Sequence, residues 1–164
     1  LLAVLHGLPA ASGAGIDRSL GALAVAAANA ARLGLAERAR LVRADWHERE
    51  WAARLDGPFD LVLANPPYVE SAAPLAPSVR GHEPAGALFA GPDGLDDYRV
   101  LVPQLPALLA PGGVALVEIG AAQADAVGRL AAAAGLEALL HRDLAGRPRV
   151  LEFKIPLGKG ESSA

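Results

Sequence analysis

Short apolar runs alternate with helical segments along this chain, and the runs end at polar residues. Phe59–Ala64 is the clearest run, and its nearly continuous apolar character is typical of a strand buried in a parallel sheet. Further strands are expected at Arg40–Ala44 and Val114–Ile119, and helices at Leu20–Leu33 and Gln123–Ala134. Strands that alternate with helices predict an α/β fold, a sheet with helices on its faces.

Two further segments refine this prediction. Gly94–Ala110 has the character of a long helix, but Pro103 and Pro106 lie inside it, and we expect them to kink or split it. The last two strands, Leu136–His141 and Val150–Ile155, follow one another without an intervening helix. They are expected to form a C-terminal antiparallel hairpin.

Composition excludes several classes of protein. The chain has 164 residues, about one domain, and a formal net charge of −3 with no long run of either sign. A nucleic-acid-coating or membrane-surface protein needs a clustered positive field, so nucleic acid is an unlikely partner and a membrane is not expected. There is no cysteine, and the four histidines lie far apart in sequence, so no metal site is expected. Because no apolar run approaches the length of a membrane span, we expect a soluble, cytoplasmic chain.

Polar residues that directly follow strands are the candidates for a site. In an open parallel sheet, ligands bind beyond the carboxyl ends of the strands. That rule selects Asp17, Asp45-Trp46, the sequence Asn65-Pro66-Pro67-Tyr68, and Glu118-Ile119-Gly120.

Asn65-Pro66-Pro67-Tyr68 is the most specific of these sequences. Each proline fixes its own φ and lacks an N–H, and Pro66 also restrains Asn65 to extended backbone, so the loop offers carbonyl acceptors with little freedom. The Asn65 side-chain oxygen and the Pro66 carbonyl can accept both hydrogens of a planar NH₂ group, while Tyr68 supplies a flat wall. Such a nitrogen is a poor nucleophile, so catalysis would depend on positioning it, which can be worth about 7–11 kcal/mol.

With its flanking sequences, this loop resembles the HemK/PrmC family, the peptide chain release factor glutamine methyltransferases. The resemblance runs from about Gly15 to Ile155. The matching sequences, in chain order, are Gly15-Ile16-Asp17-Arg18-Ser19, Asn29–Leu35, Asp45-Trp46, Asn65-Pro66-Pro67-Tyr68, Glu83-Pro84, Asp93–Tyr98, Leu109–Gly113, Glu118-Ile119-Gly120 and Asp143–Arg147.

The resemblance implies the Rossmann-like α/β fold of these methyltransferases, with helices on both faces of the sheet. It also implies S-adenosylmethionine as cofactor and a methyl transfer to the side-chain amide of the glutamine in a release factor's Gly-Gly-Gln loop. By the resemblance, Asp17 holds the ribose hydroxyls of the cofactor, and Asp45 and Trp46 bind its adenine. Asn65 would contact both cofactor and substrate amide. Pro66, Pro67 and Tyr68 would complete the acceptor site, with Glu83-Pro84 on the substrate side.

Other acceptors are compatible with the same scaffold. A ribosomal-protein glutamine or the adenine amine of nucleic acid are alternatives, although the low basic charge disfavours nucleic acid. An inactive fragment that serves only as a binding module is a third alternative.

The chain departs from the family at its N-terminal end. Family members carry a first strand and a glycine-rich loop, which this sequence lacks, and Leu1–His6 is interpreted as the helix that follows that loop. We therefore expect a partial methyltransferase domain over residues 1–157 and a disordered polar tail over 158–164. Because the first strand lies mid-sheet in this fold, its absence predicts unpaired strand edges, weak cofactor binding and marginal stability. Residues 10–15 are poor strand formers, so the strand before Asp17 is expected to be irregular.

Overall fold

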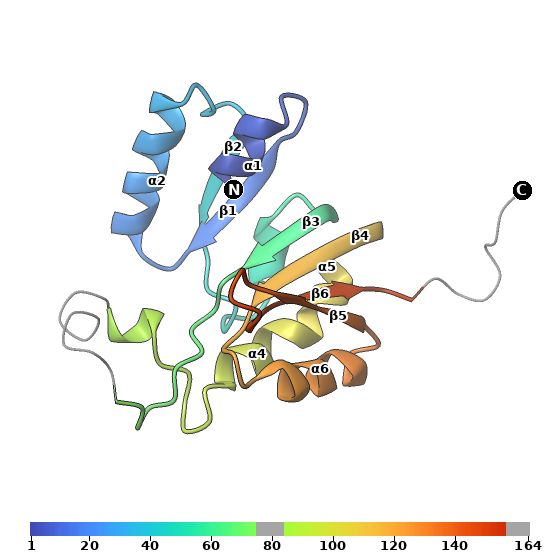
Figure 1. Cartoon of the computed structure of the whole chain (residues 1–164). Coiled ribbons are helices and arrows are strands. Elements are labelled where there is room, and N and C mark those ends of the chain that lie inside the picture. The colour runs from blue at the N-terminus through green and yellow to red at the C-terminus, as the bar shows by residue number, and fades with distance from the viewer. Residues whose placement is uncertain (75–83, 157–164) are drawn as a thin grey trace, which may run out of the picture. The chain divides into compact units, whose positions relative to one another are not determined.

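The computed structural model describes residues 1–74 and 84–156, which contain two separate β-sheets (Figure 1). The sheets belong to two units, Leu1–Gly57 and Pro58–Ala164, and each unit is described by itself. The polar tail predicted for residues 158–164 lies outside the described residues.

The first unit is a parallel strand pair with two α-helices. Strands β1 (Gly13–Asp17) and β2 (Ala39–Arg43) pair in parallel register from Gly13↔Ala39 to Asp17↔Arg43. Its helical elements are α1 (Leu2–Gly7), α2 (Leu20–Arg32) and the 3-10 helix η1 (Trp51–Arg54). Buried Leu5, Ala30, Leu35 and Ala39 form its core.

The ends of α2 follow from local sequence. Ser19 precedes the helix, and its side-chain oxygen accepts the Ala22 N–H at 3.2 Å, which satisfies one of the helix's free donors. Gly34 follows the helix with φ +68°, a conformation that glycine adopts without a Cβ clash. Both features confirm the sequence-based boundaries of this helix.

Strand β1 is regular, so the prediction of an irregular strand was wrong. A Cβ at Gly13 would lie 2.9 Å from Cδ1 of Leu1, and one at Gly15 would lie 3.2 Å from Cδ2 of Leu1 and from Cδ2 of Leu41. The glycines therefore leave room for neighbouring side chains. Five paired residues of β2 hold the strand extended in spite of its low intrinsic propensity.

The second unit is built on a four-stranded sheet of order β3-β4-β6-β5. Strands β3 (Phe59–Ala64) and β4 (Leu109–Glu118) are parallel, whereas β6 (Pro148–Lys154) is antiparallel to both β4 and β5 (Glu137–Arg142). The predicted C-terminal hairpin is thereby confirmed. Figure 1 shows α4 (Asp96–Leu101), α5 (Leu105–Leu108) and α6 (Ala124–Ala133) grouped beside this sheet. Short 3-10 helices, η2 (Ala85–Ala87) and η3 (Val102–Gln104), complete the unit.

The long helix predicted over Gly94–Ala110 is split as expected, but its end was misplaced. The segment forms α4, η3 and α5, with Pro103 and Pro106 in the first turns of the last two. Strand β4 begins at Leu109 instead of Val114 because its first residue pairs with Phe59 across a register shift. At Gly113 a Cβ would lie 2.7 Å from the Phe59 carbonyl oxygen, so this irregularity requires glycine.

Within residues 1–74 and 84–156, each sheet has two edge strands, β1 and β2 in the first sheet and β3 and β5 in the second. The sequence predicted unpaired strand edges, and β1 and β3 each present one. None of the helices in these ranges combines the length and the hydropathy that a membrane span requires.

Candidate active site

Asn65-Pro66-Pro67-Tyr68 leaves the carboxyl end of β3, as the sequence predicted. Because Ala64 pairs with Val117 in parallel, the loop starts beside the end of β4 at Glu118. Pro66 is fully buried, Tyr68 is half-buried and Asn65 is exposed. The loop is therefore anchored through its prolines and presents the Asn65 amide at the surface.

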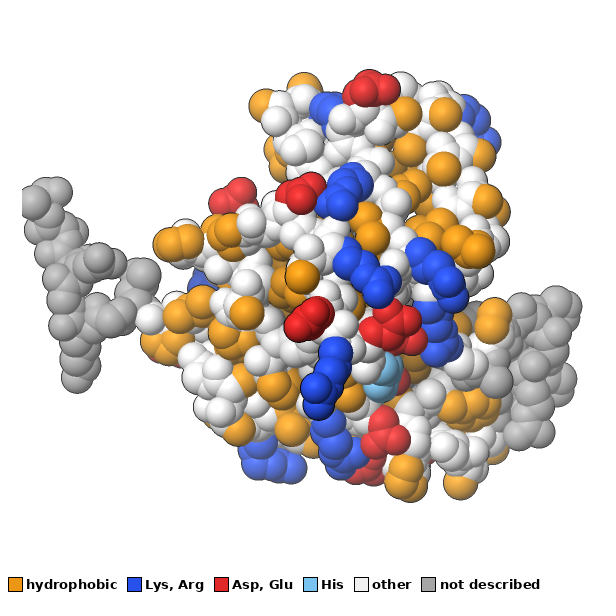
Figure 2. All heavy atoms as spheres, turned by 180° about the vertical axis from the view of Figure 1, so that it is seen from behind, with side chains coloured by type: hydrophobic (Ala, Val, Ile, Leu, Met, Phe, Trp, Pro, Cys, Tyr) orange, Lys and Arg blue, Asp and Glu red, His pale blue; other side chains and the backbone are white. Residues whose placement is uncertain are grey.

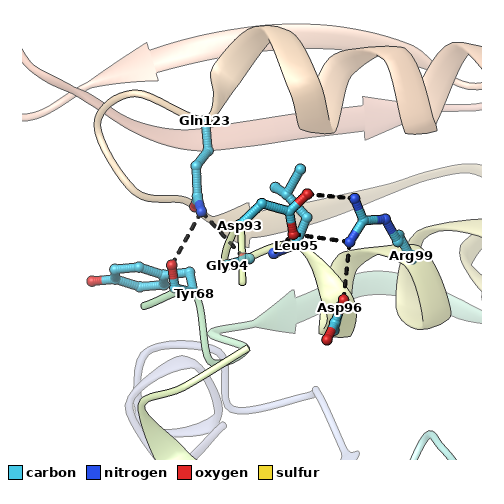
Figure 3. A network of polar contacts seen from close by, with 7 residues as sticks. All are labelled: Tyr68, Asp93, Gly94, Leu95, Asp96, Arg99 and Gln123. Carbon is cyan, nitrogen blue, oxygen red and sulfur yellow. Dashed lines mark hydrogen bonds and ion pairs between the residues drawn. The ribbon is translucent and has the colours of Figure 1, made fainter. Parts of the chain in front are cut away.

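Tyr68 is held at both of its ends. Its hydroxyl donates to Oε1 of Glu118 at 3.2 Å, and its backbone carbonyl accepts a hydrogen bond from Nε2 of Gln123 at 3.1 Å (Figure 3). Burial and the Glu118 carboxylate raise the pKa of the Tyr68 hydroxyl, and the Arg149 guanidinium opposes this shift. Tyr68 is consequently a neutral aromatic ring in a fixed orientation.

A second tyrosine, Tyr98, forms a hydrogen bond with the residue that ends β4, Glu118. Tyr98, on α4, is fully buried, and its hydroxyl donates to the Glu118 carbonyl at 2.9 Å. Burial raises the pKa of Tyr98 strongly, and the neighbouring phenol and carboxyl groups of Tyr68, Glu118 and Asp97 add to the shift. Glu118 thus accepts one tyrosine hydroxyl on its side-chain carboxylate and another on its backbone carbonyl.

The segment before α4 packs directly against Tyr68. Gly94 is buried with φ +68°, and a Cβ there would lie 2.4 Å from the Tyr68 carbonyl oxygen. The Arg99 guanidinium pairs with Asp93 and with Asp96, which fixes this segment from its other side (Figure 3). The same guanidinium lowers the pKa of Asp93.

The acids predicted on the cofactor side lie together in the first unit. Asp17 ends β1 and Asp45 follows β2, and the Asp17 carbonyl accepts the Ala44 N–H at 3.2 Å. Oδ1 of Asp17 accepts the Ser19 N–H at 2.7 Å, and Oδ1 of Asp45 accepts the His47 N–H at 3.0 Å. In the part of the chain that the structure describes, neither Oδ2 accepts a hydrogen bond. Each carboxylate can therefore bind a ligand hydroxyl or amine through that oxygen.

Comparison with known proteins identifies relatives of this chain. It is 48% identical over 154 residues to the release factor glutamine methyltransferase of Rhodospirillum rubrum, which covers 92% of this chain and 46% of that protein. The identity to the corresponding protein of Caulobacter vibrioides is 49% over 161 residues, 96% of this chain and 54% of that protein. The chain is homologous to the release factor glutamine methyltransferases. It spans about half the length of the curated relatives that it matches.

Solved structures support the fold of this homologue. A methyltransferase from Pyrococcus furiosus superposes with a TM-score of 0.65 at 14% identity, over 93% of this chain and 66% of that one. A ribosomal protein L11 methylase from Lactobacillus delbrueckii gives 0.64 at 23% identity, over 95% and 64%. These two superpositions show that the chain has the Rossmann-like α/β fold of the methyltransferases. No profile of a known protein family matches the chain.

The predicted site residues fall into two groups. Asn65, Pro66, Pro67 and Tyr68 belong to the second unit, whereas Asp17, Asp45 and half-buried Trp46 belong to the first. Glu83, proposed from the family resemblance to lie on the substrate side, is outside the described residues. Their roles in this homologue remain predictions.

The sequence did not reveal what Gln123 and Tyr98 do. Gln123 was predicted only as the start of a helix, and Tyr98 only as part of a family match. A long amide side chain five residues after the end of β4 at Glu118 could have indicated the first, because that segment lies at the carboxyl edge of the sheet. No local pattern could have indicated the hydrogen bond from Tyr98 to Glu118, which lie 20 residues apart.

Proposed function

We propose that this chain carries the acceptor site of an enzyme that transfers a methyl group from S-adenosylmethionine to a protein glutamine. The acceptor is the side-chain amide nitrogen of the glutamine in the Gly-Gly-Gln loop of peptide chain release factors. One observation carries the proposal: Asn65-Pro66-Pro67-Tyr68 is fixed at the end of β3 in a chain nearly half identical to release factor glutamine methyltransferases.

The acceptor site would work by orientation. Oδ1 of Asn65 and the carbonyl oxygen of Pro66 accept the two hydrogens of the glutamine amide, and the Tyr68 ring limits its tilt. Buried Pro66 and the two bonds on Tyr68 keep these groups in place before the acceptor binds. The nitrogen needs no base before attack, since one of the two held hydrogens leaves as a proton only after methylation. Positioning of this kind can lower a barrier by about 7–11 kcal/mol.

The residues of the first unit fit the cofactor. Asp17 can accept the ribose hydroxyls and Asp45 the adenine amine, since each carboxylate keeps Oδ2 available among the described residues. Trp46 would lie beside the adenine ring, and Asn65 would contact the cofactor as well as the acceptor. When bound, S-adenosylmethionine supplies a methyl group activated by its attachment to a positively charged sulfur.

Charge supports a protein acceptor over nucleic acid. On the face drawn in Figure 2, Lys and Arg side chains are interspersed with Asp and Glu side chains. Several cations are paired with acids, including Arg54 with Glu48, Arg147 with Asp143 and Lys154 with Glu152. Duplex binding relies on unpaired cations that neutralise phosphates.

An enzyme that modifies release factors would work in the cytoplasm.

The test is methyl transfer from radiolabelled S-adenosylmethionine to a purified release factor. Label should enter the factor and should be absent when its Gly-Gly-Gln glutamine is replaced by asparagine. Asn65→Ala should reduce transfer about a hundredfold because the amide loses an orienting acceptor. Asn29→Ala, at the other asparagine of the chain and on α2, is the matched control.

Assays with other methyl acceptors distinguish the release factor proposal from its alternatives. Label in a ribosomal protein or in an adenine oligonucleotide, with none in the release factor, would replace this proposal by one of the alternative acceptors. Binding of S-adenosylhomocysteine without transfer to any of them would favour the binding module.

A further inference from the structure

We propose that Gln123 is a positioning residue that sets the place of Tyr68 in the acceptor site. Gln123 precedes α6, and its side chain extends toward the backbone of Tyr68 and Gly94 (Figure 3). The inference rests on the proposed function for its catalytic consequence. The structural connection itself is independent of any substrate.

The Gln123 amide joins three separate segments. Nε2 donates to the carbonyl of Tyr68 at 3.1 Å and to the carbonyl of Gly94 at 3.2 Å. Oε1 accepts the backbone N–H of Gly120 at 3.0 Å. Both amide hydrogens and the amide oxygen are therefore used, and the three segments are fixed relative to one another.

Two glycines pack directly against the Gln123 amide. A Cβ at Gly94 would lie 2.7 Å from Nε2 of Gln123, and a Cβ at Gly120 would lie 2.8 Å from Oε1. The Cβ at Gly120 would also lie 3.4 Å from Cδ2 of Tyr68. The two glycines thus allow the amide and the tyrosine ring to approach the backbone closely.

The hydrogen bonds at position 123 require two N–H donors and one acceptor, which a glutamine side chain supplies. A glutamate at this position has the same shape and can still accept the Gly120 N–H, but it offers no donor to the carbonyls of Tyr68 and Gly94. It would place a negative charge against two carbonyl oxygens. Gln123→Glu therefore removes the two bonds that position Tyr68 and leaves the third.

Tyr68 itself would then keep only the hydrogen bond of its hydroxyl to Glu118, while the next residue, Val69, stays bonded to Leu88 and Ala90. The Glu118 bond lies at the far end of the side chain, so the backbone of residues 65–68 would be less restrained. Asn65 and Pro66, which would orient the acceptor amide, lie in the same loop. A shift there should slow the chemical step more than it weakens binding of the acceptor.

Two variants and one control test the proposal. Gln123→Glu removes the donors and adds charge, whereas Gln123→Met keeps the length without charge. Gln104→Glu makes the same chemical change at the only other glutamine, whose Nε2 donates to Val100 within its own helical segment at 2.7 Å. If Gln123→Glu fails to fold, Gln123→Met still decides the question.

The first readout is backbone hydrogen exchange followed by mass spectrometry on the full chain. Peptides that span residues 65–70 and 91–96 should exchange about tenfold faster in both Gln123 variants. Loss of the bonds to the Tyr68 and Gly94 carbonyls loosens the segments in which the Val69 N–H donates to the Leu88 carbonyl and the Asp96 N–H to the Ala90 carbonyl. Peptides from β6 should be unchanged, and Gln104→Glu should leave residues 65–70 unchanged. Unaltered exchange of residues 65–70 in both Gln123 variants would overturn the proposal.

The second readout is the methyl-transfer assay. In both Gln123 variants, kcat should fall about tenfold while KM for the release factor changes less than threefold. Equal loss in Gln104→Glu, or full kcat in both Gln123 variants, would contradict a positioning role. Should the unaltered chain methylate no acceptor, the proposed function fails, and the exchange experiment still decides whether Gln123 positions Tyr68.

Discussion

Tyr68 donates a hydrogen bond to Glu118 across 50 residues of sequence, with 3.2 Å between the hydroxyl and Oε1. The backbone carbonyl of the same glutamate accepts the Tyr98 hydroxyl at 2.9 Å. Glu118, at the end of β4, therefore joins Tyr68 of the predicted methyl-acceptor site to Tyr98 in the core. Changes at the core side should alter stability, and changes at the loop side should alter function.

Both tyrosines should titrate above their ordinary pKa. Burial is the largest cause in each case, and these are the only two tyrosines in the chain. The folded state favours the neutral phenols, so their contribution to stability is complete below pH 10.0 and falls as pH rises further. Ultraviolet absorbance should place the phenolate transition of the native protein at higher pH than that of the protein in denaturant, which should titrate near the ordinary pKa of 10.0. A native transition that coincides with the denatured one would contradict the raised pKa of both tyrosines.

Asp17→Asn should weaken binding of S-adenosylhomocysteine. The variant keeps Oδ1 as acceptor for the Ser19 N–H, so α2 should be undisturbed, but it loses the charge and an acceptor oxygen. Loss of hydrogen bonds to a charged group should raise the Kd ten- to hundredfold, which corresponds to roughly 1.5–3 kcal/mol. Isothermal titration measures this change. Asp60→Asn, exposed on β3, is the matched control. A Kd near ~1 μM for the unaltered chain would contradict the expectation that it binds cofactor weakly.

Gly94→Ala should destabilise the chain more than Gly135→Ala. Both glycines have positive φ, +68° and +75°, but a Cβ at Gly135 meets nothing within 4 Å. Gly135→Ala should cost about 1 kcal/mol of unfolding free energy from backbone strain alone. Gly94→Ala adds the contact with the Tyr68 carbonyl, for roughly 3 kcal/mol in all, measured by urea denaturation. Equal losses would show that Tyr68 moves aside without cost.

The β5–β6 turn should open in acid. The backbone N–H of Arg147, its guanidinium and the Ala145 N–H all bond the Asp143 carboxylate and lower its pKa below the ordinary 3.8. The carboxylate therefore stabilises the turn above pH 3.8, and this contribution disappears as pH falls through the lower, folded-state value. Amide exchange of Gly146, whose N–H donates to the Asp143 carbonyl at 2.8 Å, reports the opening. The quantity to compare is the Gly146 protection factor, which is the exchange rate of the unfolded chain divided by that of the native protein at the same pH. Asp143→Asn should remove the pH dependence of this protection factor, and a protection factor that acid does not change in the unaltered chain would refute this role.

Local sequence determined the features that depend on near neighbours. Ser19 caps α2 through a residue three positions away, and Gly34 ends the same helix through its own φ. The apolar run over Phe59–Ala64 was correctly predicted as β3, with Asn65 directly after it. Such signals lie within one turn or one strand, so composition and spacing reveal them.

The tertiary structure decided the features that depend on distant partners. Leu109 joins β4 because it pairs with Phe59, and glycine-rich β1 is regular because β2 pairs along its whole length. Gln123 contacts Tyr68 across 55 residues and Gly94 across 29, and no local pattern encodes either bond. The sequence determined which residues follow each strand, but hydrogen-bond register and close packing between remote segments decided which of them meet, because those contacts exist only once the chain has folded.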